Sequence, residues 1–185
     1  MYSAVKQTPP LRSFVDLSLL TSAAVSAALL AGAHLFEAAG YAPCDLCMDQ
    51  REAHWAGFAV TGAGLAASLV WRARLAAAAA VGAAALVYAI SAGLALYHTG
   101  VEFGYWPGPP TCSGGGALPD TIDLTTAFSS DGPRVSCTDA AWRFLGISMA
   151  GYNFLFSGGL FVLCLGAAVA TTRRVRHDAA TGGSA

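Results

Sequence analysis

Four long apolar runs occupy most of this 185-residue chain and constrain its fold more than any other feature. They extend over residues 14–36, 53–71, 75–97 and 147–170. A helix of about 20 residues crosses the roughly 30 Å hydrocarbon core of a bilayer, so each run has about the length that one crossing needs. A soluble bundle would carry a polar stripe along each helix, whereas these runs are apolar on every face. The sequence therefore predicts an all-α membrane protein, a bundle of four transmembrane helices.

The composition agrees with a membrane protein and excludes a nucleic-acid partner. Charged residues make up 11% of the chain, against about 25% in a typical soluble domain. The formal net charge is −1, and no basic patch occurs outside the two termini and one short loop. We expect residues 1–185 to form a single membrane domain surrounded by lipid. The first apolar run exceeds the usual 7–15 residue core of a signal peptide, so we expect it to remain as a span.

The distribution of lysine and arginine predicts the orientation in the membrane. If four spans alternate in direction, seven of the ten basic residues fall on one side: Lys6, Arg12, Arg72, Arg74, Arg173, Arg174 and Arg176. Lysine and arginine concentrate in cytoplasmic loops. We therefore expect both termini to be cytoplasmic, and the loops 37–52 and 98–146 to lie on the opposite side.

Four of the five cysteines fall in these two outer loops, two in each loop. Cys44 and Cys47 lie in the first loop, and Cys112 and Cys137 lie in the second. Disulfides form and persist in the bacterial periplasm or an equivalent oxidising compartment. The fifth, Cys164, lies inside the last apolar run, where a free cysteine behaves as a small hydrophobic residue. We assign no chemistry to Cys164.

The C-x-x-C pair in the segment PCDLCMDQREAHW favours a redox role. A disulfide between Cys44 and Cys47 closes a very short loop and so gains little as a structural crosslink. The two sulfurs nevertheless stay within reach of one another after reduction. A helix that begins near Cys47 would stabilise its thiolate through the helix dipole. Arg51, four residues later on the same helical face, would add a permanent positive charge.

The cysteine pattern has other interpretations. Two cysteine pairs could bind zinc through four thiolates, but Cys112 and Cys137 do not form a second C-x-x-C motif. Covalent haem needs C-x-x-C-H, and Met48 follows Cys47. We therefore expect no metal site. A four-span structural membrane protein with inert loop disulfides stays open as an alternative.

The second outer loop supplies three more features. The segment TDAAWRFLG after Cys137 predicts a short helix in the membrane interface, capped by Thr138 or Asp139 and anchored by Trp142. His98 ends the third apolar run and Met149 begins the fourth, at the membrane face that carries the first cysteine pair. Taken alone, a histidine such as His98 is typical of a helix C-terminus, where its charge is favourable. Taken alone, Met149 would be interpreted as a residue that packs between helices.

Together these motifs resemble those of the bacterial disulfide bond formation protein B (DsbB) family. The resemblance is carried by C-x-x-C-x-x-x-R at Cys44, Cys47 and Arg51, by four spans, and by two cysteines in the second outer loop. The flanking segments YHTGVEFGYWPGPPTC and CTDAAWRFLGISMAGYN also match, so the similarity covers residues 42–153. It implies a multi-pass protein of the bacterial inner membrane.

The resemblance further implies a quinone-dependent thiol oxidase. Such a protein reoxidises a periplasmic thioredoxin-fold dithiol oxidase (DsbA-like) and passes the electrons to a membrane quinone, either ubiquinone or menaquinone. Cys112, paired with Cys137, would form the mixed disulfide with that partner. Cys44 and Cys47 would be the pair beside the quinone, with the Cys47 thiolate next to the quinone ring.

Three further residues match quinone-proximal positions of the family: Arg51, His98 and Met149. A thiol redox protein of the vitamin K epoxide reductase type is an alternative enzyme with similar chemistry. Its C-x-x-C motif is expected late in the chain, whereas here the motif follows the first span.

Overall fold

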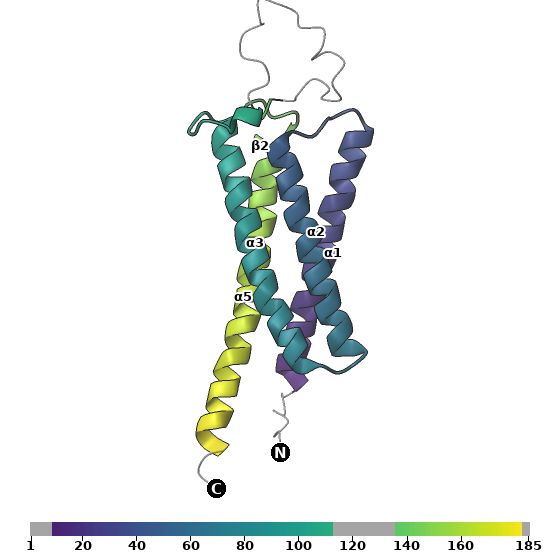
Figure 1. Cartoon of the computed structure of the whole chain (residues 1–185), viewed down its shortest axis with the longest axis vertical. Coiled ribbons are helices and arrows are strands. Elements are labelled where there is room, and N and C mark those ends of the chain that lie inside the picture. Colours follow the sequence, from purple (N-terminus) through teal and green to yellow (C-terminus); the bar gives the residue numbers. More distant parts are fainter. Residues whose placement is uncertain (1–8, 113–135, 183–185) are drawn as a thin grey trace, which may run out of the picture.

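The computed structural model describes residues 9–112 and 136–182, and within these ranges the chain forms four long α-helices. They are α1 (Pro9–Ala38), α2 (Asp45–Leu69), α3 (Arg74–Glu102) and α5 (Met149–Gly182). The helices run side by side in alternating directions (Figure 1). The beginning of α1 and the end of α5 lie at one end of the bundle, and the end of α1, the beginning of α2 and the end of α3 lie at the other. The prediction of an all-α fold is confirmed.

Three helices in the described part of the chain are long and apolar enough to cross a membrane: α1, α3 and α5. The helix α2 is 25 residues long but does not meet the same standard of apolarity. Its first three turns explain this, because they carry Asp45, Asp49, Arg51, Glu52 and His54. A fourth crossing by α2 therefore stays a prediction.

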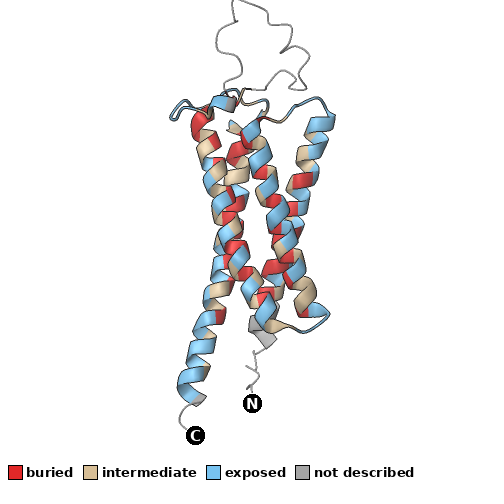
Figure 2. Ribbon diagram, viewed as in Figure 1, coloured by how far each residue is buried: buried red, intermediate tan, exposed pale blue. Residues whose placement is uncertain are grey.

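The bundle has an apolar outside and a partly polar inside. Large side chains such as Leu86 (64% exposed) and Val162 (66% exposed) point outward, where lipid would cover them. Buried polar residues include Ser22, Thr61 and Ser91, all fully enclosed between helices. Figure 2 shows the buried residues in red on the faces that the helices turn toward one another. This arrangement is typical of helices that pack through small and polar side chains in a bilayer.

The helices extend further toward the loop end than the apolar runs predicted. The first outer loop, expected over residues 37–52, shrinks to residues 39–44 because α1 continues to Ala38 and α2 begins at Asp45. Likewise α3 continues to Glu102, so His98 lies inside the helix, one turn before its end. At the opposite end of the bundle, α5 continues past the predicted span 147–170 to Gly182.

The predicted short interfacial helix after Cys137 is wrong. The segment instead forms a β-hairpin, in which β1 (Arg143–Phe144) pairs antiparallel with β2 (Ile147–Ser148). The two residues of its turn, Leu145 and Gly146, have φ of 50° and 80°, as a type I′ hairpin turn requires. A helix cannot include two such residues.

The segment between α3 and Cys112 folds back onto the end of α3. The ring of Trp106 stacks on Tyr97 with centroids 5.9 Å apart, and the Tyr97 hydroxyl donates to the Pro107 carbonyl at 2.8 Å. The indole lies directly over Gly100, where any Cβ would collide with it. The absence of a side chain at Gly100 therefore lets this segment carry Cys112, in the 3-10 turn η1 (Pro110–Cys112), back to the bundle.

We expect Gly100→Ala to destabilise the protein by about 1–3 kcal/mol, because the new methyl group overpacks the contact with Trp106. Gly93→Ala is the matched control in the same helix. A Cβ there meets no atom within 4 Å, so the change should stabilise by about 0.5–1 kcal/mol. Unfolding of both variants in detergent checks this, and equal stability of the two would contradict it.

Candidate redox site

The C-x-x-C pair lies at the first turn of α2. Cys44 is the N-cap residue in extended conformation, with φ −84° and ψ 171°. Its Sγ accepts a hydrogen bond from the backbone N–H of Cys47 at 3.3 Å. The N-terminal N–H groups of a helix have no partners within the helix, so they favour a negative charge at this position. Both cysteines are free thiols, and the positive end of the helix dipole lies beside them.

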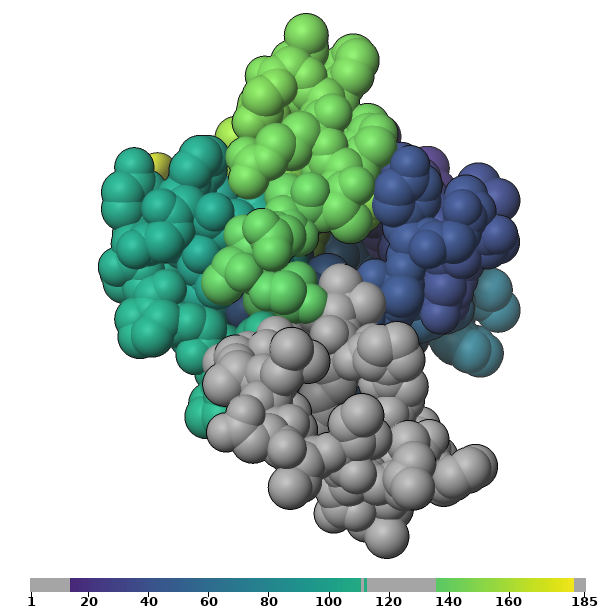
Figure 3. Space-filling model, turned by 90° about the horizontal axis from the view of Figure 1, so that it is seen from above, coloured from purple at the N-terminus to yellow at the C-terminus, as the bar shows by residue number. Residues whose placement is uncertain are grey.

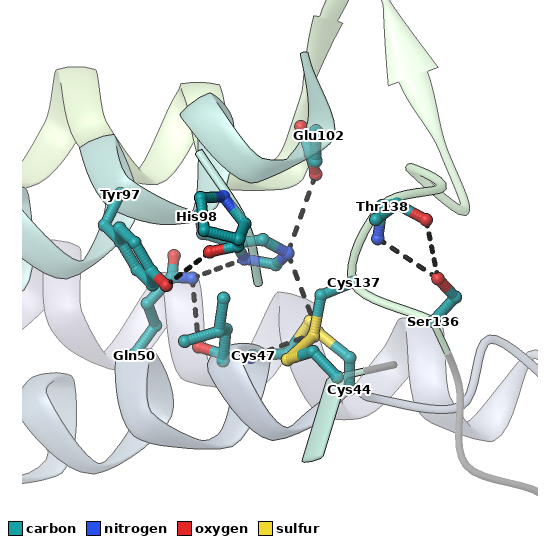
Figure 4. Close-up of a disulfide and its surroundings, with 12 residues drawn as sticks. Cys44, Cys47, Gln50, Tyr97, His98, Glu102, Ser136, Cys137 and Thr138 are labelled. Carbon is teal, nitrogen blue, oxygen red and sulfur yellow. Dashed lines mark hydrogen bonds and ion pairs between the residues drawn. A yellow bond between two sulfur atoms is a disulfide. The ribbon is translucent and has the colours of Figure 1, made fainter. Parts of the chain in front are cut away.

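The second cysteine pair lies against the first. Cys112 and Cys137 form a disulfide with Cα atoms 5.1 Å apart. Both belong to one buried cluster with Cys44 and Leu46 of α2 and Val101 of α3. Figure 4 shows the sulfur atoms gathered at the end of α2, next to His98. Four cysteines that are up to 93 residues apart in the sequence, from Cys44 to Cys137, thus meet at one end of the bundle.

The side chain of His98 reaches from α3 to this cluster. Its Nε2 lies 3.7 Å from the Cys44 Sγ and 3.8 Å from a carboxylate oxygen of Glu102. Its Nδ1 lies 2.8 Å from the side-chain amide of Gln50, which also donates to the Leu46 carbonyl. The imidazole is therefore fixed from both sides and faces the Cys44 sulfur (Figure 4). Sequence reasoning singled out His98 but missed Gln50 and Glu102.

Arg51 projects from the next turn of α2 toward the end of α1. Its guanidinium donates to Glu37 at 2.6 Å and to the Ala33 carbonyl at 3.1 Å. The side chain is only 12% exposed, whereas Glu37 is 45% exposed. These contacts hold a positive charge at a fixed position within one helical turn of Cys47.

A buried chain of polar side chains continues from Gln50 into the bundle. Asn153 donates to the Gln50 side chain at 2.6 Å and lies 2.6 Å from His54 through its own oxygen. His54 in turn contacts Ser26 at 3.2 Å, and Ser26 contacts the Tyr88 hydroxyl at 2.8 Å. Sequence reasoning missed this chain. Its signal was the spacing of Gln50 and His54, four residues apart on one face of α2, but the charged residues around Gln50 conceal it.

A cavity of about 440 Å³ opens beside the cysteines. Apolar side chains of α1, among them Leu29, Leu30 and Phe36, form much of its wall. The residues predicted for the site that also line it are Cys44, Cys47, Arg51, His98 and Met149. Figure 3 shows this end of the bundle from above. The segment that follows residue 136, in light green, covers part of it, and a hollow separates this segment from the blue ends of α1 and α2.

The two thiols of the C-x-x-C pair, which lie outside the membrane-spanning segments, differ in acidity. A hydrogen bond with the Cys44 side chain lowers the pKa of Cys47 most, and the charge of Arg51 contributes to the same direction. The pKa of Cys44 is raised, first by its hydrogen bond with Cys47 and then by burial. Cys47 is therefore the member of the pair that carries negative charge when both are reduced.

We expect alkylation of reduced protein by iodoacetamide to show this order. A lowered pKa means that the reactive thiolate forms at lower pH, so Cys47 should react at lower pH than Cys44. Arg51→Gln should move the Cys47 profile to higher pH, by less than the separation of the two cysteines, because Arg51 is a smaller cause. Peptide mass spectrometry across a pH series measures both. A Cys44 that reacts at lower pH than Cys47 would contradict the assignment.

Two cysteine pairs in one cluster at the end of an apolar helical bundle define a membrane protein of thiol–disulfide chemistry. Comparison with known families agrees. The family model described as disulfide bond formation protein DsbB matches residues 16–167, and the chain belongs to this family. It is thus a membrane protein of disulfide-bond formation, with oxidoreductase chemistry. Neither the curated proteins nor the solved structures contain a match.

Proposed function

We propose that the chain is a quinone-dependent thiol oxidase. It reoxidises a DsbA-like, thioredoxin-fold dithiol protein and passes the electrons to a membrane quinone. The observation that supports this most is the meeting of Cys112 and Cys137 with Cys44 in one buried cluster, beside a cavity that Cys47 and Arg51 also line. Inert loop disulfides do not need such proximity, nor a cavity next to free thiols.

The transfer from the soluble partner is a thiol–disulfide exchange. A thiolate of the partner attacks Cys112, the disulfide to Cys137 breaks, and Cys137 leaves as a thiolate. The second partner thiol then releases Cys112, so the partner gains a disulfide and this chain gains two thiols. Both sulfurs belong to residues that are only 1% exposed, so this exchange requires a local opening around them. The two thiols then reduce a Cys44–Cys47 disulfide.

The size and lining of the cavity support a quinone head group as its ligand. Its volume of about 440 Å³ falls within the roughly 300–1,000 Å³ of small-molecule sites, and its wall is mainly apolar with a few polar groups. A bound quinone would accept two electrons and two protons as the C-x-x-C pair becomes a disulfide. Cys47 and Arg51 both line this cavity, so Cys47 would be the thiolate next to the quinone and the Arg51 guanidinium would stabilise negative charge that develops there. The Nε2 atom of His98 lies 3.7 Å from the Cys44 sulfur, where it would take up or return the proton of that thiol.

The proposed orientation places the cysteines on the periplasmic side of the inner membrane and both termini in the cytoplasm. Arg72 and Arg74 belong to the connection from α2 to the first residue of α3, and Arg173 and Arg174 to the C-terminal part of α5. In Figure 1 this connection and the end of α5 lie at the end of the bundle where α1 begins, as expected for a cytoplasmic side. α2 packs between α1 and α3 and returns the chain from the loop end to the terminal end. If α1 and α3 cross the bilayer, α2 crosses it too, with its polar first turns near the periplasmic face.

Reconstitution tests the function. The purified chain is mixed with a reduced thioredoxin-fold dithiol protein and either ubiquinone or menaquinone, and absorbance of the quinone is followed. We expect the quinone absorbance to fall, with each molecule of this chain reducing many molecules of quinone. Cys164→Ala is the control that keeps the other four cysteines and should retain the rate, because Cys164 is buried in the bundle next to Ser22.

Cys47→Ala should reduce the rate to that of the mixture without protein. Equal rates for Cys47→Ala and Cys164→Ala would rule out this route for the electrons. So would the absence of any reduction of both quinones by the unmodified chain.

A further inference from the structure

Three potential metal ligands converge at the first turn of α2. The sulfurs of Cys44 and Cys47 and a ring nitrogen of His98 all lie within 4.8 Å of one another in the described part of the chain. We propose that the reduced C-x-x-C pair and His98 form a binding site for a thiophilic d10 ion such as Zn²⁺. This proposal concerns metal binding and does not rest on the quinone or on a protein partner.

The distances suit tetrahedral coordination. Zinc–sulfur bonds of about 2.3 Å and zinc–nitrogen bonds of about 2.0 Å separate a sulfur ligand from a nitrogen ligand by about 3.6 Å, and two sulfur ligands by about 3.8 Å. The Cys44 Sγ and His98 Nε2 are already 3.7 Å apart. Because no pair exceeds 4.8 Å, a shift of about 1 Å by the less buried Cys47 completes the three-ligand set.

Glu102 supplies a second, independent indication of a cation. Its side chain is only 4% exposed, one turn after His98, with one carboxylate oxygen 3.8 Å from His98 Nε2. The other oxygen is buried and has no hydrogen-bond partner in the described structure. A buried carboxylate oxygen without a partner is costly. A metal ion held by His98 would offset this cost, with Glu102 as fourth ligand or as a nearby charge.

The imidazole is also supported as a metal ligand. A histidine that binds metal through Nε2 donates its Nδ1 proton to an acceptor, which fixes the ring. Gln50 lies 2.8 Å from Nδ1 and holds the ring in place. Its amide nitrogen also donates to the Leu46 carbonyl and its oxygen accepts from Asn153, so metal binding at Nε2 requires the Gln50 amide to turn and exchange these contacts, while the ring keeps its position.

The site depends on redox state. Binding releases the protons of both thiols, and a Cys44–Cys47 disulfide offers no thiolate. A metal ion therefore captures only the reduced pair and keeps it from reacting further. The site differs from a zinc site of four thiolates, because Cys112 and Cys137 are bonded to each other and do not contribute.

Cadmium titration tests the proposal on the full chain in detergent, without quinone or partner. We expect one Cd²⁺ per reduced chain, detected by thiolate-to-metal charge-transfer absorption, and none after oxidation of Cys44 and Cys47 to the disulfide. Cys112→Ser with Cys137→Ser should bind equally well. His98→Ala should weaken binding by at least about tenfold. Equal binding by His98→Ala, no binding by the reduced chain, or loss of binding in the Cys112 and Cys137 variant would each overturn the proposal.

A measurement on the unmodified chain covers the case in which His98→Ala does not fold. X-ray absorption of the protein with Cys44 and Cys47 reduced and the Cys112–Cys137 disulfide intact, loaded with Zn²⁺, should show two sulfur ligands and at least one imidazole nitrogen. A four-sulfur environment, or one without nitrogen, would refute the assignment. Because no electron transfer is measured, a failure here leaves the proposed oxidase function intact.

Discussion

Replacement of Arg51 by alanine is expected to slow quinone reduction by about 10²-fold, the usual effect of removing one fixed group that stabilises developing negative charge. The guanidinium lines the cavity and lies within a helical turn of Cys47. All four cysteines should stay competent for exchange, because Arg51 makes no hydrogen bond to any of them; loss of its charge only moves the pH at which the Cys47 thiolate forms. Steady-state quinone absorbance measures the first effect, and exchange with a partner dithiol in the absence of quinone measures the second.

Two variants separate the charge of Arg51 from its structural contacts. Arg51→Lys keeps the charge and should recover a large part of the rate. Glu37→Gln removes the ion-pair partner but keeps a hydrogen-bond acceptor, and it should leave the rate within a few-fold of the unmodified chain. A partly exposed pair contributes only about 0–1 kcal/mol to stability, so neither change should unfold the bundle. If Glu37→Gln slowed the reaction as much as Arg51→Ala, the role of Arg51 would be structural.

The sequence was informative wherever local physics decides the structure. Apolar runs fix where long helices lie, because a bilayer accepts only segments that satisfy their own backbone hydrogen bonds. The position of Cys47 at a helix N-terminus also followed from local pattern, since α2 begins at Asp45. The family was correctly identified from C-x-x-C-x-x-x-R and the second-loop cysteines.

The sequence was least informative where contacts between segments far apart in the chain determine the structure. The extension of α3 to Glu102 was missed because HTGVE looks polar, although His98 and Glu102 are buried on one face by the segments that fold over them. The hairpin at Arg143–Ser148 was missed because apolar residues next to Trp142 suggested a helix, while the decisive signal was Gly146 in its turn. The contact between Cys44 and His98 joins residues 54 positions apart, and no local pattern contains it.

The second large effect is expected for Cys112→Ala, which should abolish reaction with the partner dithiol. The substitution removes the sulfur that forms the mixed disulfide and leaves Cys137 without its bonded partner. Cys44 and Cys47 should nevertheless be found as a disulfide whenever quinone is present, because their route to the cavity does not pass through Cys112. Trapping of free thiols followed by mass spectrometry reads the state of each cysteine.

Comparison with Cys137→Ala tests, in a single experiment, whether Cys112 is the cysteine that reacts with the partner. In Cys137→Ala, Cys112 is a free thiol that can attack the disulfide of an oxidised partner and form a mixed disulfide with it. Without Cys137, no second sulfur of the pair can break that bond, so the mixed disulfide should accumulate. Cys112→Ala should accumulate far less of it, even though Cys137 is equally buried. Finding Cys44 and Cys47 reduced in Cys112→Ala despite added quinone would instead mean that the cavity-side pair is oxidised through the second pair. The proposed direction of electron flow, from Cys112 and Cys137 to Cys44 and Cys47, would then be reversed.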